Sequence, residues 1–133
     1  MNMINFRQEN YANDTQKTIM AVDNAPLMPS ILRSIIVGGG YNFTRAKSSK
    51  DAIRMVESKK PDLLILRTAM DDMDGYELAK TLKARGNTVP MIFLSDSATK
   101  DSVVKAHQAG AKDYITNTID RDTLLSKIAK QIA

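Results

Sequence analysis

The sequence predicts an α/β domain in which five helices cover a doubly wound, five-stranded parallel sheet. From Lys17 onward, short apolar runs alternate with longer segments of helical period, which is the pattern of βα units around a parallel sheet. The run Leu63–Leu66 is continuously apolar, as expected of a strand that is covered on both faces. Five such units fit into the chain, and right-handed crossovers then give 2-1-3-4-5 as the simplest strand order.

Each expected strand is short, and a segment of helical period follows it. The strands are expected over Thr18–Val22, Tyr41–Arg45, Leu63–Leu66, Met91–Leu94 and Asp113–Thr116. The helices are expected from Leu27 to Val37, from Ser48 to before Pro61, from Asp74 to Gly86, from Lys100 to Ala109, and from Asp120 onward.

Polar residues mark the starts of three of these helices. Ser48 with Asp51, and Asp74 with Glu77, have the three-residue spacing of a capping box. Asp120 is a typical N-cap residue for the last helix.

Length and composition indicate one globular domain. The chain has 133 residues, of which 43% are apolar and 26% charged, and no apolar run approaches the ~20 residues of a membrane span. Residues 1–16 are polar and lack the order of a signal peptide, so we expect a flexible N-terminal arm, a domain over 17–133, and a cytoplasmic location.

Composition also narrows the chemistry. The chain has no cysteine and one histidine, which excludes disulfides and Cys-ligated metal and makes a His-based zinc site improbable. The formal charge is 19 − 15 = +4, but basic and acidic residues are mixed along the chain. Nucleic-acid binding is therefore an unlikely role for this domain.

A functional site is expected where the first, third, fourth and fifth strands end, because ligands of doubly wound sheets bind at the carboxyl edge. The residues at these strand ends are Asp23, Asn24, Arg67, Ser95 and Asn117.

Several motifs in order resemble the receiver domains of two-component response regulators, which have a flavodoxin-like fold. The resemblance covers Lys17–Ala133 and rests on Val22-Asp23-Asn24, Pro61-Asp62-Leu63, Met73–Leu78 and Ala109–Tyr114. It implies magnesium-assisted phosphoryl transfer to an aspartate at the end of the third strand, with carboxylates on the metal and a Lys and a Ser or Thr on the phosphoryl oxygens.

The pocket residues depart from that pattern. Asp23 and Ser95 are kept, whereas Asn24 stands in place of the second acid and Asn117 in place of the lysine. Arg67 stands where the resemblance puts the acceptor, and a guanidinium is a permanent cation that cannot accept a phosphoryl group. A Mg²⁺ about 5 Å from it would feel ~6 to 7 kcal/mol of repulsion at an effective dielectric of ~20.

Two arrangements of Arg67 are open. The favoured one pairs Arg67 with Asp23 in the space of the missing metal, with Asn24 or Asn117 adding hydrogen bonds. In the other, Arg67 turns out to solvent and leaves an inert pocket.

The resemblance then predicts a degenerate pseudo-receiver that is not an enzyme, has no metal or cofactor, and signals through protein contact. It implies a protein partner or self-association through the fourth helix, fifth strand and fifth helix, with no membrane contact. The residues expected there are Val103, His107, Tyr114, Thr116 and Lys127. In such domains a hydroxyl on the fourth strand and an aromatic on the fifth, here Ser95 and Tyr114, couple the pocket to this surface.

Two alternatives stay open. The chain could be a divergent receiver that is phosphorylated at an unconventional acid such as Asp71 or Asp72. It could also be a weak nucleic-acid-binding module, which the charge permits but no motif supports.

Overall fold

A computed structural model describes residues 15–97, 99–116 and 118–132. It contains a parallel sheet of five strands in the order β2-β1-β3-β4-β5, with five helices, which confirms the predicted fold class. The strands are β1 Thr18–Val22, β2 Asn42–Ala46, β3 Leu63–Arg67, β4 Met91–Ser95 and β5 Asp113–Thr116. The helices are α2 Met28–Gly38, α3 Ser49–Lys59, α4 Gly75–Ala84, α5 Lys100–Gln108 and α6 Arg121–Ile132.

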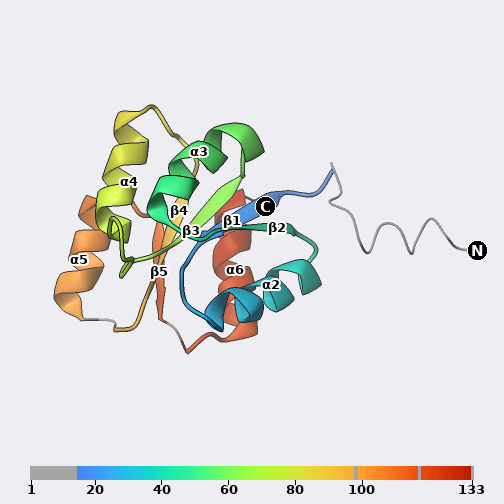
Figure 1. The fold of residues 1–133 in the computed structure, drawn as a ribbon. Helices are drawn as coiled ribbons and strands as arrows, with labels where there is room; N and C mark the ends of the chain where they lie inside the picture. The colour runs from blue at the N-terminus through green and yellow to red at the C-terminus, as the bar shows by residue number, and fades with distance from the viewer. Residues whose placement is uncertain (1–14, 98, 117, 133) are drawn as a thin grey trace, which may run out of the picture.

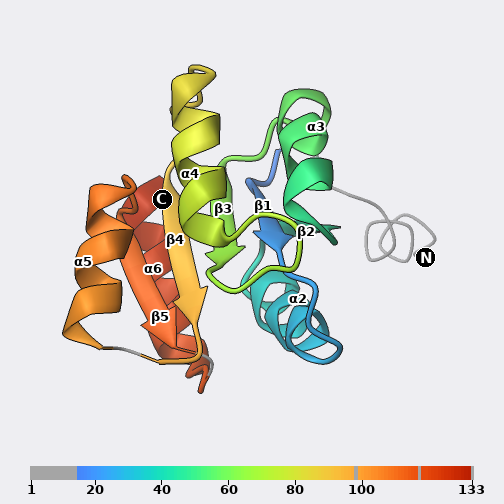
Figure 2. The same ribbon diagram turned by 60° about the vertical axis from the view of Figure 1, so that its left-hand side comes forward.

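The sheet separates two apolar layers. On one face, alternate strand residues such as Ile19 and Ile65 pack with Leu32 of α2 and Leu124 of α6. On the other face, the intervening strand residues pack with α3, α4 and α5. Figures 1 and 2 show these helices on opposite sides of the sheet. Both faces of β3 and β4 are therefore buried, as the continuous apolar runs predict.

The predicted helix starts are present. The Ser48 side chain accepts a hydrogen bond from the Asp51 amide at 3.0 Å, and Asp74 accepts one from the Glu77 amide at 2.8 Å. The last helix has the same kind of cap, since Asp120 accepts from the Thr123 amide at 2.9 Å. These caps place the loops before the helices at the carboxyl edge of the sheet.

The second strand is displaced by one residue from its predicted position. It runs over Asn42–Ala46 rather than Tyr41–Arg45, and all but its last residue are only partly buried. A partly buried edge strand contains few apolar residues, so the pattern of apolar residues alone did not determine where this strand begins and ends.

Gly75 brings the β3–α4 loop close to the third strand. A Cβ atom at this position would lie 2.4 Å from the carbonyl oxygen of Arg67, a distance that only glycine avoids. Its amide also donates to the Thr68 carbonyl at 2.9 Å. The loop therefore lies directly against the end of β3, where the candidate site begins.

None of the helices in the described ranges combines the length and apolar character needed to span a bilayer.

Candidate functional site

The centre of the carboxyl edge is an ion pair between the ends of β1 and β3. Val22 and Leu66 are partners in the parallel register, so the residues that follow them, Asp23 and Arg67, are neighbours. Nε of Arg67 lies 2.5 Å from Oδ1 of Asp23, and the two side chains are 9% and 1% exposed. The predicted internal pair is thus confirmed, and the arrangement with Arg67 in solvent is wrong.

The charge state of Arg67 is set by its carboxylate neighbours. Burial acts to lower the pKa of Arg67, but the hydrogen bond and charge of Asp23, followed by those of Asp96, raise it above its ordinary value. Arg67 is therefore a fixed positive charge inside the crevice.

One carboxylate oxygen of Asp23 accepts all of the hydrogen bonds that this side chain makes with described residues. Its Oδ1 also accepts a hydrogen bond from the Ala25 amide at 2.8 Å. Within the described residues, its buried Oδ2 has no hydrogen-bond partner. Because Arg67 binds the oxygen that already accepts from the backbone, this carboxylate is held in one orientation.

Asp96 is a second carboxylate on the same arginine, and the sequence did not predict it. Its Oδ1 lies 3.2 Å from a terminal nitrogen of Arg67, and its side chain is 64% exposed. Asp96 directly follows Ser95 at the end of β4. The available signal was its place beside the strand end, together with the reach of an arginine side chain.

Asn24 and Ser95, the other described residues of the predicted pocket, have hydrogen bonds outside the ion pair. Nδ2 of Asn24 donates to Oδ2 of Asp71 at 2.9 Å, so the expectation that Asn24 supports the ion pair is wrong. Ser95 is buried, and its Oγ accepts from the Ser97 amide at 3.3 Å. Asn117 lies outside the described residues.

Asp72, one of the two alternative phosphate acceptors, caps the neighbouring helix. Its carboxylate oxygens accept from the amides of Ser49 at 3.2 Å and Lys50 at 3.0 Å at the start of α3. The hydrogen bond from the Lys50 amide is the main cause that lowers the pKa of Asp72 below its ordinary value. With both oxygens bound to backbone amides, Asp72 is poorly placed to act as a nucleophile.

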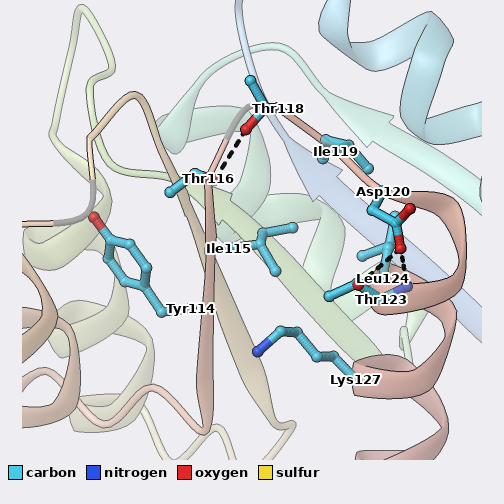
Figure 3. Close-up of a pocket in the computed structure, with 9 residues that line it drawn as sticks. All are labelled: Tyr114, Ile115, Thr116, Thr118, Ile119, Asp120, Thr123, Leu124 and Lys127. Carbon is cyan, nitrogen blue, oxygen red and sulfur yellow. Dashed lines mark hydrogen bonds between the residues drawn. The ribbon is translucent and has the colours of Figure 1, made fainter.

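The residues expected at a partner surface lie around β5 at the edge of the sheet. Val103, His107 and Tyr114 line one hollow of about 210 Å³, between α5 and the strand. Tyr114, Thr116 and Lys127 line a second cavity of about 300 Å³, between the strand and α6. Figure 3 shows the Tyr114 ring on one side of β5 and Lys127 on the other. The structure thus brings all five predicted residues to one side of the molecule.

Two of these residues have fixed partners. Nζ of Lys127 lies 2.7 Å from Oδ1 of Asp113, with both side chains partly exposed. The Tyr114 hydroxyl donates to the carbonyl of Ser97 and lies 3.0 Å from Oγ of Ser102. In contrast, the Val103 side chain is exposed at the hollow between α5 and β5.

A doubly wound parallel sheet with a charged crevice at its carboxyl edge defines a class of α/β domains that bind or react at that edge. Comparison with known families gives the particular class. Residues 19–129 match the family model described as "Response regulator receiver domain", and the chain belongs to this family.

Similar proteins agree with this assignment. Over 115 residues, the chain is 32% identical to the "Transcriptional regulatory protein ZraR" of Salmonella typhimurium. The aligned residues cover 86% of this chain and 26% of that protein. It is 28% identical to the "DNA-binding transcriptional regulator NtrC" of Escherichia coli, with 86% and 24% covered. The chain thus spans about a quarter of the length of these relatives.

Solved structures share the fold. A putative response regulator from Chloroflexus aurantiacus has a TM-score of 0.84 at 24% identity, covering 89% of this chain and 98% of its own. The signal receiver domain of a putative LuxO repressor protein from Vibrio parahaemolyticus has a TM-score of 0.82 at 21% identity, covering 88% and 90%.

The crevice residues do not fit the magnesium ion of this family. The guanidinium of Arg67 already lies on Asp23, and Asn24 is turned toward Asp71. Among the described residues, no three acidic, histidine or cysteine side chains are grouped to hold a metal. Magnesium requires several oxygen ligands in close octahedral geometry, and a cation in contact with the main carboxylate opposes it.

Proposed function

We propose that this chain is a receiver domain that signals through protein contact and without phosphorylation. One observation carries the proposal. Arg67 ends β3, where the resemblance puts the phosphate-accepting aspartate, and it is buried against Asp23. The proposal includes no catalytic activity, no cofactor and no metal.

The chemistry supports this proposal at two steps. A guanidinium has no free lone pair with which to attack a phosphoryl group. The ion pair also gives the crevice a cation that belongs to the chain, so the attraction that would draw Mg²⁺ to Asp23 is already neutralised. Phosphoryl transfer at this edge would need both a nucleophile in place of Arg67 and a site that attracts Mg²⁺.

The surface around β5 is the proposed contact region. Its hollows between the strand and the flanking helices combine apolar, hydroxyl and charged residues, as protein interfaces do. Since the relatives are longer proteins named as transcriptional regulators, the partner could be another domain of the same protein or a separate protein. The proposal requires only that this contact be independent of a phosphoryl donor.

The first test is exposure of the chain to acetyl phosphate and Mg²⁺, followed by intact mass measurement. We expect no added phosphoryl group in the wild-type chain, because Arg67 cannot accept one. We also expect none in Arg67→Asp, because Asn24 and Asn117 still stand in place of the second carboxylate and the lysine. The triple variant Asn24→Asp, Arg67→Asp, Asn117→Lys is the positive control, since it restores all three groups. A phosphoryl group on the wild-type chain would contradict the proposal.

The same experiment tests phosphorylation at an unconventional acid. If mass increases, peptide mapping after trapping of the acyl phosphate identifies the acceptor, and Asp71→Asn and Asp72→Asn are the matched variants. A phosphoryl group lost in only one of them would establish that residue as the acceptor. Binding of random duplex DNA that weakens steeply with salt would instead favour the nucleic-acid role.

The second test concerns the surface. Tyr114→Ala and His107→Glu should weaken concentration-dependent association in sedimentation experiments while the fold is kept. Ser34→Asp on the exposed side of α2 is the control, because it adds charge away from β5. If only Ser34→Asp weakens association, the contact lies on α2 and not around β5.

A further inference from the structure

The strand β2 forms the edge of the sheet opposite β5 (Figure 2). In the described part of the chain, β2 pairs with β1 alone. The Asn42 amide and the Ala46 carbonyl both bond to backbone groups on the β1 side. Because the direction of the backbone groups alternates along a strand, Phe43 and Arg45 turn their N–H and C=O groups outward. These groups can pair with another strand.

The two outward residues have the spacing that a second copy of the same strand requires. In an antiparallel pair, residues whose backbone groups face the partner strand exchange two hydrogen bonds, and the residue between them lies directly opposite a residue that it does not bond. A pairing centred on Thr44 therefore joins Phe43 to Arg45 of the second copy, and Arg45 to Phe43. Thr44 then lies opposite its own counterpart. This arrangement is symmetric and closes as a dimer.

The side chains of this segment are complementary under the same pairing. Phe43 and Arg45 lie on one face of the sheet, so each Arg45 is opposite the Phe43 ring of the other copy, where a guanidinium is attracted to the ring. Just beyond the two ends of the strand, Tyr41 and Lys47 have the same relation. No two like charges from residues 41–47 lie directly opposite each other, an arrangement that would oppose the dimer.

An exposed apolar residue of α2 lies beside this edge. The guanidinium carbon of Arg33 lies 5.8 Å from the centre of the Phe43 ring, so this side of α2 faces β2. Val37 is one helical turn further along the same side, and it is 51% exposed. Two copies that pair through β2 bring their α2 helices to the same face of the joined sheets. The second copy can therefore cover Val37.

We propose that β2 is an interface between two copies of this chain, which pair antiparallel about Thr44 and join their sheets edge to edge. The occupant of the edge is a second copy because residues 41–47 are complementary to themselves in spacing and in charge. The inference goes beyond the proposed function. It concerns the edge opposite β5, and it does not depend on whether the chain accepts a phosphoryl group.

The first test measures amide hydrogen exchange of the wild-type chain at increasing protein concentration. The amides of Phe43 and Arg45 should exchange about ten-fold slower once sedimentation shows dimers, because they gain hydrogen bonds to the second copy. The Thr44 amide faces β1 at every concentration, so its exchange is the control within the same strand.

Three results of this measurement would overturn the inference. The first is a chain that stays monomeric up to ~1 mM, where any specific association would be very weak. The second is a dimer in which Phe43 and Arg45 are not protected. The third is protection of both amides that does not depend on protein concentration, since another segment of the same chain would then cover the edge.

The second test places charges at the centre of the pairing. Thr44→Lys and Thr44→Glu each put like charges directly opposite each other, and each should weaken self-association about five-fold. An equimolar mixture of the two variants should restore it, because Lys then lies opposite Glu. Thr88→Lys and Thr88→Glu, at an exposed position outside β2, are the matched controls and should change nothing.

The mixture distinguishes this interface from any other. Weakening by both Thr44 variants without recovery in the mixture would overturn the pairing about Thr44. Tyr114→Ala lies at the opposite edge of the sheet and should leave the β2 dimer intact. Self-association that is lost in Tyr114→Ala and kept in both Thr44 variants would belong to the region around β5, and it would overturn the inference.

Discussion

Two ion pairs in this molecule have similar lengths and different surroundings. Arg67 lies 2.5 Å from Asp23, and Lys127 lies 2.7 Å from Asp113. The side chains of the first pair are 9% and 1% exposed, whereas those of the second are 28% and 24% exposed. Water screens the charges that it can reach. Burial, rather than the length of the pair, therefore sets how much stability is lost when one member is removed.

The difference assigns the two pairs to different tasks. The inner pair joins the ends of β1 and β3, and removal of one member would leave the other charge buried without its main partner. The outer pair joins β5 to α6 at the proposed contact region, where water can replace either member. A partner could therefore rearrange the outer pair at little cost, while the inner pair stays fixed.

Asp23→Ala should have the largest effect of any single change in these pairs. It leaves Arg67 buried, with the exposed Asp96 as its remaining ion-pair partner among the described residues. We expect a loss of about 3 kcal/mol in the free energy of unfolding, the lower end of the range for breaking a buried pair, because Asp96 still attracts the guanidinium. Urea unfolding measures this loss, and Asp51→Ala, which removes the exposed partner of Arg54, is the control with less than about 1 kcal/mol.

A double variant separates the stranded charge from other consequences. Asp23→Asn with Arg67→Met removes both charges and keeps an acceptor for the Ala25 amide. We expect its stability to lie within about 1 kcal/mol of the wild type, because replacing a whole buried pair is often nearly neutral. If the double variant is as unstable as Asp23→Ala, the loss comes from packing and the comparison between the two pairs fails.

The inner pair was predictable from the sequence, whereas its surroundings were not. Two apolar strands that pair in parallel bring the residues after them together, so Asp23 and Arg67 had to meet. Asn24 instead binds Asp71, a contact between two loops 47 positions apart that no periodicity reports. Asp96 was missed because the reach of one arginine side chain, rather than a strand or helix pattern, decides its role.

The rest of the sequence prediction divides in the same way. The fold followed from apolar runs and helix caps, both of which act over a few residues, and β2 and α2 each begin one residue later than predicted. Independence from phosphorylation, the partner surface, the flexible arm over 1–16 and the cytoplasmic location stay predictions. Phosphorylation, partner binding and location depend on other molecules, which a local sequence pattern does not describe. Residues 1–14 of the expected arm lie outside the described residues.

Lys127→Met tests the outer pair and should have a smaller effect. Both members are partly exposed, so we expect a loss of at most about 1 kcal/mol in the free energy of unfolding. The loss should shrink at about 1 M NaCl, where the screening length falls to ~3 Å. The loss in Asp23→Ala should persist at the same salt concentration. Equal salt sensitivity of the two variants would show that water reaches the inner pair as well.

Asp72→Asn should have the smallest effect, and it tests a carboxylate that pairs with backbone amides instead of a cation. The hydrogen bond from the Lys50 amide holds the pKa of Asp72 below its ordinary value of 3.8 in the folded state. Burial opposes this effect, and the Ser49 amide adds a smaller lowering. A lowered folded-state pKa means that the charged form stabilises the fold above pH 3.8 and that this contribution is lost as the pH falls through the lowered value.

We therefore expect Asp72→Asn to lose about 0.5 kcal/mol at pH 7, the low part of the range for a charge at a helix N-terminus, because the side chain is exposed. The gap from the wild type should close as the pH falls below about 4, since the wild-type carboxylate then becomes neutral like the amide. Urea unfolding of both proteins from pH 7 to pH 2 measures it. A gap that stays constant down to pH 2 would mean that the charge of Asp72 contributes nothing to holding the β3–α4 loop against α3.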